Sequence, residues 1–245
     1  MKILAISGSP RNGYCEEAIN LIKQHFKNNC TDFKIIKLTE INILECKGCL
    51  ACVKKGEEYC PLNDDRDFLI MQMLESDGLI IASPAYAAQV TSIMKKTIER
   101  ISFFAHRPQF NNKYAMTISA CCGLGAKETN KYLKKVFSFF GYNVSASLEI
   151  FNGVTEPNEE ELDKIRFNTI EKANAFLHSL LNKPAIMPTL EQLIVFNIFK
   201  KLSVIYQDTM QADFKYYQFK KEFYDDAGVN PVKKIIARLV ARGIK

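Results

Sequence analysis

The chain begins with a short apolar run, Ile3 to Ile6, that breaks at once into a Gly-, Ser- and Pro-rich stretch from Ser7 to Gly13. An apolar run that ends in this way before an amphipathic segment is typical of the first strand and first helix of an open α/β sheet. Small residues at such a turn let backbone N–H groups approach a ligand, and the helix dipole favours an anion. The stretch predicts a phosphate-binding turn with Arg11 as a charged donor, and an ordinary βα turn without a ligand is the alternative.

Strand and helix patterns alternate along the chain as far as about residue 181. After the first strand, further strands are predicted over 33–38, 79–82, 114–119 and 144–151. Helices are predicted over about 13–27, 65–75, 93–101, 132–140 and 157–181. Five strands alternating with five helices favour right-handed crossovers, so the predicted fold class is α/β with a doubly wound, five-stranded parallel sheet.

Three Gly-, Ser- or Pro-rich stretches, at 7–13, 83–92 and 119–126, each follow a predicted strand. In a parallel sheet the carboxyl ends of the strands lie at one edge, and ligands bind there near the point at which the strand order reverses. The three stretches are therefore expected to meet at that edge and to form one site.

The length of 245 residues suits one domain of ordinary size with an appendage. Pro184 and Pro188 interrupt the helical pattern, and three further helical patterns follow at about 190–206, 210–224 and 232–242. We expect a domain over residues 1–182 and a helical C-terminal extension over residues 183–245. The last helical pattern is both basic and amphipathic, so it is predicted to cover this subunit or a second copy, in preference to a membrane surface.

The formal net charge of +6 is uneven, since residues 184–245 hold ten Lys and Arg against six Asp and Glu. No dense basic stripe with interleaved aromatic residues occurs in the first 180 residues, which argues against a nucleic-acid partner. No run of about 18 apolar residues occurs, and Pro10 and Arg11 interrupt the N-terminal apolar stretch. We therefore expect a cytoplasmic protein without a signal peptide or a membrane span.

Four of the eight cysteines crowd into fifteen positions, in the order Cys46-x2-Cys49-x2-Cys52-x7-Cys60. In a reducing compartment such crowding indicates metal or redox chemistry rather than a disulfide framework. A loop can point soft thiolates at this spacing toward one iron–sulfur cluster, whereas structural zinc sites usually separate their ligands into two pairs. A zinc ion and a thiol set without metal are the two alternatives. The three histidines lie apart from one another and are not expected to be ligands.

The loops from Ser7 to Arg11 and from Ser83 to Tyr86, with the Gly-rich turn near Gly123, resemble those of the flavodoxin-like NAD(P)H-dependent FMN reductases over about residues 1–180. In that family the first loop holds the FMN phosphate, the loop after the third strand lies against the isoalloxazine ring, and the loop after the fourth strand reaches its pyrimidine end. Carried over by position, the resemblance implies three groups of FMN-binding residues: Ser7, Ser9, Pro10, Arg11, Asn12 and Cys15 at the phosphate, Pro84, Ala85 and Tyr86 beside the ring, and Ser119, Cys121 and Gly123 at its far edge.

The start of the first helix departs from the family pattern. Members commonly have Asn-Thr or Asn-Ser there, where this chain has Tyr14, Cys15 and Glu16. The usual side-chain cap is replaced, so backbone N–H groups and Arg11 are the expected phosphate donors. The Gly-x-Gly at 123–125 lacks the third glycine of a dinucleotide fingerprint, so NAD(P)H is expected to bind transiently at the open face of the flavin.

Together with the flavin loops, the four clustered cysteines resemble the motif of the iron–sulfur flavoproteins, a branch of the same superfamily in which a compact cysteine motif holds a [4Fe-4S] cluster. The resemblance implies Cys46, Cys49, Cys52 and Cys60 as cluster ligands and a homodimeric assembly. Because no acid–base pair or catalytic triad can be argued from the spacing, the cofactors are expected to carry the reaction.

The expected function is that of an FMN-dependent oxidoreductase that moves electrons between NAD(P)H or a protein donor and a small-molecule or protein acceptor. The flavin would accept a hydride and return electrons one at a time through the cluster. One alternative is an FMN-only quinone, azo or flavin reductase with an unfilled cysteine motif. The other is a flavin-binding electron carrier that does not turn over NAD(P)H.

Overall fold

A five-stranded, all-parallel sheet lies at the centre of the protein. The computed structural model describes residues 1–29, 32–153, 157–184, 187–220 and 230–243. Its strands are β1 (Lys2–Ser7), β2 (Asp32–Lys37), β3 (Gly78–Ala82), β4 (Tyr114–Cys121) and β5 (Asn143–Phe151). They lie in the order β2-β1-β3-β4-β5, and every neighbouring pair is parallel. This arrangement confirms the predicted flavodoxin-like α/β fold, and the strand order reverses between β1 and β3.

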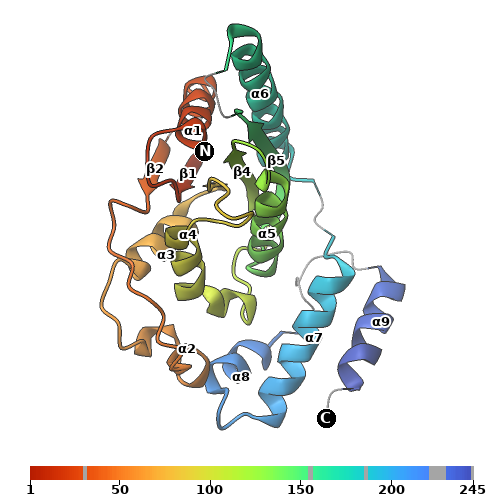
Figure 1. Ribbon diagram of the computed structural model, residues 1–245. Helices are drawn as coiled ribbons and strands as arrows, with labels where there is room; N and C mark the ends of the chain where they lie inside the picture. The colour runs from red at the N-terminus through yellow and green to blue at the C-terminus, as the bar shows by residue number, and fades with distance from the viewer. Residues whose placement is uncertain (30–31, 154–156, 185–186, 221–229, 244–245) are drawn as a thin grey trace.

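Helices cover both faces of the sheet (Figure 1). One face carries α1 (Tyr14–His25) and α6 (Glu159–Asn182), and the other carries α3 (Arg66–Glu75), α4 (Ser92–Arg100) and α5 (Ala126–Phe139). The strand β3 is buried along its whole length, because Leu79 and Ile81 face one helical layer while Ile80 faces the other. Its continuous apolar run therefore has the two-sided burial that the sequence predicts.

The connection between β2 and α3 contains two short helical turns that the sequence pattern does not indicate. These are α2 (Ala51–Lys54) and the 3-10 turn η1 (Glu57–Tyr59); a third such turn, η2 (Ser102–Ala105), follows α4. Four or three residues are too few to show a helical period, so the pattern indicates only a long connection. Both α2 and η1 lie in residues 46–60, the segment with the four clustered cysteines, which we name the cysteine loop.

The C-terminal extension forms a helical group at the bottom of Figure 1, below the sheet. It consists of α7 (Leu190–Ile205), α8 (Gln211–Tyr217) and α9 (Pro231–Arg242), and it has a small core of its own around Phe196 and Tyr217. The helix predicted over 210–224 ends earlier than expected, at Tyr217, and residues 221–224 lie outside the described residues. Among the helices that the structure describes, none has the length and apolar character needed to cross a membrane.

The helix α9 packs against α7 through the small side chains of Ala237 and Ala241, which are both buried. Its large aliphatic side chains point outward, and Val232 is 63%, Ile235 59% and Leu239 57% exposed. The amphipathic face of α9 therefore does not cover the described part of its own subunit.

Candidate functional site

Hydrogen bonds join the loops after β1 and β3 at the carboxyl edge of the sheet. The Thr91 hydroxyl donates to the Gly8 carbonyl at 2.7 Å, and the Thr91 N–H donates to the Ser83 hydroxyl at 3.1 Å. The Gly8 N–H in turn donates to the Ala82 carbonyl at 2.8 Å. A Cβ atom at Gly8 would lie 2.8 Å from Cβ of Met94, so this close approach requires glycine. The two loops are thus fixed relative to each other.

A hollow of about 280 Å³, which we name the edge hollow, lies where the loops after β1, β3 and β4 meet. Eight of the predicted FMN-binding residues line it: Ser9, Arg11, Asn12, Cys15, Pro84, Ala85, Tyr86 and Cys121. Six further residues complete the lining: Gly13, Tyr14, Glu17, Ala120, Cys122 and Asn152. The predicted convergence of three sequence-distant loops is therefore present in the fold.

Four predicted residues, Ser7, Pro10, Ser119 and Gly123, do not line the edge hollow. The Ser7 hydroxyl donates to the Glu16 carboxylate, and both side chains are buried. Ser119 is fully buried in β4, and its hydroxyl has no hydrogen-bond partner among the described residues. The sequence pattern fixes the position of these residues along the chain but not the direction in which their side chains point.

The N-terminus of α1 is open toward the edge hollow. Its N-cap residue, Gly13, makes no side-chain cap hydrogen bond, and the positive end of a helix dipole favours an anion. The exposed guanidinium of Arg11 makes no ion pair or hydrogen bond with any described residue. Lys37, at the end of β2, donates to the Asn12 side-chain oxygen at 2.9 Å and adds a second cation that sequence reasoning missed. These groups suit a phosphate.

Cys15 lines the edge hollow but is only 2% exposed. Burial raises the pKa of its thiol from 9.0 to about 12, against the smaller opposite effect of a hydrogen bond with the Ala120 backbone. The side chain is therefore a neutral thiol at physiological pH, and it contributes contact surface rather than a nucleophile.

A tight turn positions Tyr86 at the edge hollow. The backbones of Tyr86 and Gln89 exchange hydrogen bonds of 2.8 and 3.0 Å, and the two residues between them, Ala87 and Ala88, have φ angles of 50° and 58°. Such a turn usually contains glycine or asparagine, because left-handed backbone is strained for other residues. Gly125 of the next loop packs against it, since a Cβ atom there would lie 2.7 Å from Cα of Ala88.

The four clustered cysteines, Cys46, Cys49, Cys52 and Cys60, line a second hollow of about 40 Å³, which we name the cysteine pocket. Within the described ranges, no three Cys, His, Asp or Glu side chains lie close enough to hold a single metal ion. A polynuclear cluster keeps its thiolates farther apart than one ion does, because each iron carries its own thiolate. Four soft thiol donors around one pocket therefore fit an iron–sulfur cluster in their chemistry.

Buried arginines surround the cysteine pocket. Arg100 donates from one guanidinium nitrogen to Sγ of Cys60 at 3.3 Å and from another to Asp64 at 2.8 Å, and Arg66 also lines the pocket. Burial alone would raise the pKa of the Cys60 thiol, but the Leu62 N–H and the Arg100 guanidinium together lower it below its usual value. At Cys60 the surroundings thus favour the thiolate, which is the form that binds metals, whereas burial raises the pKa of the neighbouring Cys52 thiol.

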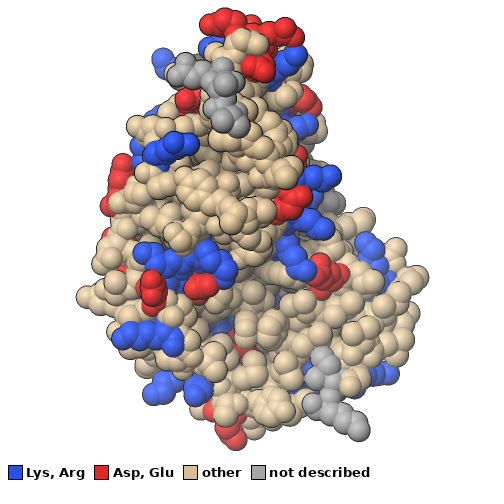
Figure 2. All heavy atoms as spheres, viewed as in Figure 1, with Lys and Arg blue, Asp and Glu red and all other residues tan. Residues whose placement is uncertain are grey.

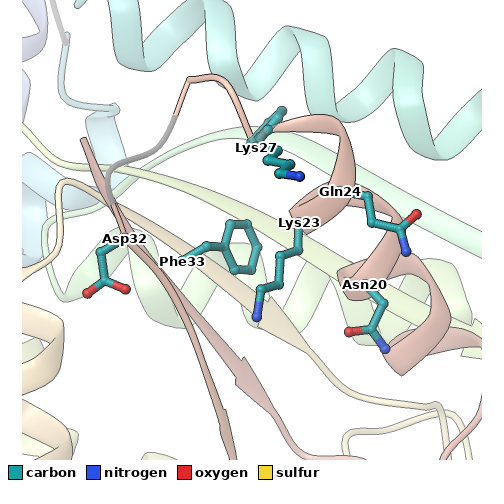
Figure 3. A pocket seen from close by; sticks show the side chains of 7 residues that line it. Asn20, Lys23, Gln24, Lys27, Asp32 and Phe33 are labelled. Carbon is teal, nitrogen blue, oxygen red and sulfur yellow. The ribbon is translucent and has the colours of Figure 1, made fainter.

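A hollow larger than the edge hollow and the cysteine pocket lies at the opposite edge of the sheet, at the end of α1 and the start of β2 (Figure 3). It measures about 600 Å³ and is lined by Asn20, Lys23, Gln24, Phe26, Lys27, Asp32 and Phe33. None of the predicted site residues lies there, and its lining comes from two neighbouring elements of the chain. Size alone therefore does not mark it as the functional site.

Residues 1–153 match the protein family described as NADPH-dependent FMN reductase. An iron-sulfur flavoprotein of Archaeoglobus fulgidus is 30% identical over 224 residues, which are 90% of this chain and 99% of the relative. A second iron-sulfur flavoprotein, from Methanosarcina thermophila, is 28% identical over 177 residues, or 70% of this chain and 91% of the relative. Among solved structures, a flavone reductase superposes with a TM-score of 0.57 at 17% identity, covering 75% of this chain and 64% of that one.

Proposed function

The chain belongs to the NADPH-dependent FMN reductase family, and from that premise we propose an FMN-dependent oxidoreductase that also carries a [4Fe-4S] cluster. The observation that carries this proposal is the edge hollow, where eight residues predicted to bind FMN come together from three separate loops. The hollow lies at the carboxyl edge of the sheet, beside the reversal of strand order between β1 and β3.

In this proposal each loop that lines the edge hollow binds a different part of FMN. The open N-terminus of α1, with Arg11 and Asn12, would bind the phosphate. Pro84 and Tyr86 would lie against the isoalloxazine ring, and Cys121 would lie at its far edge. FMN bound there would supply hydride acceptance and one-electron transfer, and the chain would supply binding and orientation.

The cysteine pocket supports the second cofactor. Its four thiols are the proposed ligands, and the two relatives described above are both named iron-sulfur flavoproteins. A cluster held by four thiolates is an anion, and buried Arg66 and Arg100 would compensate its charge. The cluster supplies single-electron transfer. The reducing cytoplasm, which keeps such thiols free for metal, is the proposed compartment.

The donor is proposed to be NADPH or NADH, and the acceptor a small molecule or a protein. The proposed assembly is a homodimer, and the exposed aliphatic face of α9 is the candidate contact surface. Figure 2 shows that the surface over α7 and α9, at the lower right, is largely uncharged with Lys and Arg at its margin. The domain boundary at residue 182 belongs to the same proposal.

Anaerobic purification from cells able to assemble clusters tests both cofactors. We expect about one FMN and about four iron atoms per chain, and a visible spectrum with both flavin and cluster absorption. Cys49→Ser should lose the iron and keep the FMN, whereas Cys30→Ser, a matched change outside the cysteine loop, should keep both. A yellow wild-type protein without iron would contradict the proposal of a cluster. The FMN-only reductase would then be the remaining function.

Stopped-flow mixing with NADPH and with NADH tests the reaction. Bleaching of the flavin absorption by either nucleotide is the expected result for a reductase. A flavin that neither nucleotide bleaches would instead identify an electron carrier that receives its electrons from a protein.

A further inference from the structure

The C-terminal extension reaches the cysteine loop through a buried carboxylate. Asp213 lies on α8 and is fully buried, although it belongs to a short helix at the periphery of the molecule. One of its oxygens accepts a hydrogen bond from the Arg107 guanidinium, and the other lies 2.9 Å from Nδ1 of His106. The carboxylate is thus held by two adjacent residues that follow η2 in the main domain.

The other side of the Arg107 guanidinium faces the cysteine loop. A second guanidinium nitrogen donates to the backbone carbonyl of Cys52 at 3.0 Å and to the Glu57 carboxylate at 2.7 Å. Arg107 is only 3% exposed and lies over the Phe103 ring. Its planar group therefore joins α8, α2 and η1 at once, which a single ammonium group cannot do in this geometry.

The cysteine loop needs support of this kind. The helix α2 has four residues, and an isolated helix of that length is unstable in water. It contains Cys52, and it contacts the helix α8, which lies outside the cysteine loop. Burial of a carboxylate and a guanidinium is costly unless both are fully paired, so the network is stable only when the extension and the loop are both in place.

We propose that Asp213, acting through Arg107, is a positioning residue for the cysteine loop, so that the C-terminal extension is part of the site at the four cysteines. This inference rests on the proposed function where it concerns the cluster. The proposed effect of Asp213 on the order of the cysteine loop requires no cofactor.

Hydrogen–deuterium exchange of the full chain, without added iron, tests the order of the loop. Asp213→Asn keeps the size of the side chain and removes its charge. We expect the amides of α2 to exchange about tenfold faster or more, because a charge-assisted hydrogen bond is lost, while β-sheet amides keep their rates. Asp208→Asn, the same change at an exposed position before α8, should leave α2 unaffected.

The ratio of iron to FMN in anaerobically purified protein tests the link to the four cysteines. In Asp213→Asn we expect iron to fall at least severalfold while FMN stays at its wild-type ratio, with a matching loss of the electron paramagnetic resonance signal of the reduced cluster. A general loss of stability would lower both cofactors together. Tyr217→Phe removes the bond between α8 and the His106 carbonyl without touching Arg107, and it should keep the iron.

If Asp213→Asn gives no folded protein, Glu57→Gln tests the same network from its partly exposed side and should raise the exchange of α2. Unchanged exchange and unchanged iron in the folded variants would overturn the proposal. Equal effects of Tyr217→Phe and Asp213→Asn would also overturn it, because docking of α8 in general would then be responsible. Faster exchange in Asp213→Asn with no iron even in the wild type would contradict the proposed cluster and keep the positioning role.

Discussion

Arg100 donates a hydrogen bond to the sulfur of Cys60 while it forms a buried ion pair with Asp64. Hydrogen bonds and positive charge next to a cluster sulfur stabilise the reduced state, which carries one more negative charge. We predict that Arg100→Gln makes the reduction potential of the cluster more negative in an anaerobic redox titration. Arg166→Gln, an exposed control on α6, should have the wild-type potential. An equal or more positive potential in Arg100→Gln would contradict the assignment of Cys60 as a ligand.

Arg11 is predicted to bind the phosphate of FMN. Its exposed guanidinium is free of other described partners, so Arg11→Gln should weaken FMN binding by about tenfold or more. Fluorescence titration of the apoprotein measures the affinity. Riboflavin, which lacks the phosphate, should bind wild type and variant alike. If riboflavin binding falls as much as FMN binding does, Arg11 does not contact the phosphate.

The raised pKa of the Cys15 thiol predicts that the folded protein loses stability at high pH. Folding raises the pKa of its thiol from 9.0 to about 12, so the folded state keeps the proton that the unfolded state releases. This contribution is complete below about pH 9, and it is lost as the pH rises toward 12. Urea unfolding at pH 8 and pH 10 should show a loss about 1.4 kcal/mol larger in wild type than in Cys15→Ala. Equal losses of stability in the two proteins would show that folding does not raise the pKa of the Cys15 thiol.

The turn that holds Tyr86 contains Ala88 in left-handed backbone, with φ of 58°. Ala88→Gly should stabilise the protein by about 1 kcal/mol, because glycine adopts this conformation without steric cost. Replacement of alanine by glycine within a helix has the opposite effect on stability. Ala175→Gly, on the exposed side of α6, should therefore destabilise the protein by about 1 kcal/mol. The urea concentration at the midpoint of unfolding measures both changes in stability. A lower midpoint in Ala88→Gly than in wild type would show that the left-handed backbone at Ala88 is not strained.

If the aliphatic face of α9 is the dimer contact, formation of the dimer depends on Leu239. Light scattering with size-exclusion chromatography should give a dimer for wild type and a monomer for Leu239→Ser. Phe167→Ser, at a more exposed apolar position on α6, should stay dimeric. A wild-type monomer that sediments with anionic lipid vesicles would instead assign this basic, amphipathic helix to a membrane surface.

The fold could be predicted because its signals are local and repeated. The run from Leu79 to Ala82 indicates a strand buried on both faces, and the strands β1, β3 and β4 are each followed by a loop rich in Gly, Ser or Pro. Parallel topology then places these loops at one edge without any knowledge of side-chain packing. This is why eight of the predicted residues line a single hollow.

The orientation and long-range pairing of side chains could not be predicted in this way. The sequence predicts Ser7 as a phosphate donor, but its hydroxyl donates to the buried Glu16 carboxylate. Lys37 reaches Asn12 only because β2 lies beside β1. Asp213 and Arg107 are 106 residues apart, and no periodicity connects them. Contacts of this kind depend on tertiary packing, which leaves no local pattern.

The distance along the chain between Arg107 and Asp213 also sets an order of events during synthesis. The cysteine loop and Arg107 leave the ribosome long before Asp213 is made, since 106 residues separate the two members of the ion pair. Until then the loop lacks the helix that it packs against and the carboxylate that neutralises its buried guanidinium. The cysteine loop therefore gains the support of α8 only in the last stage of folding, after most of the chain has been made.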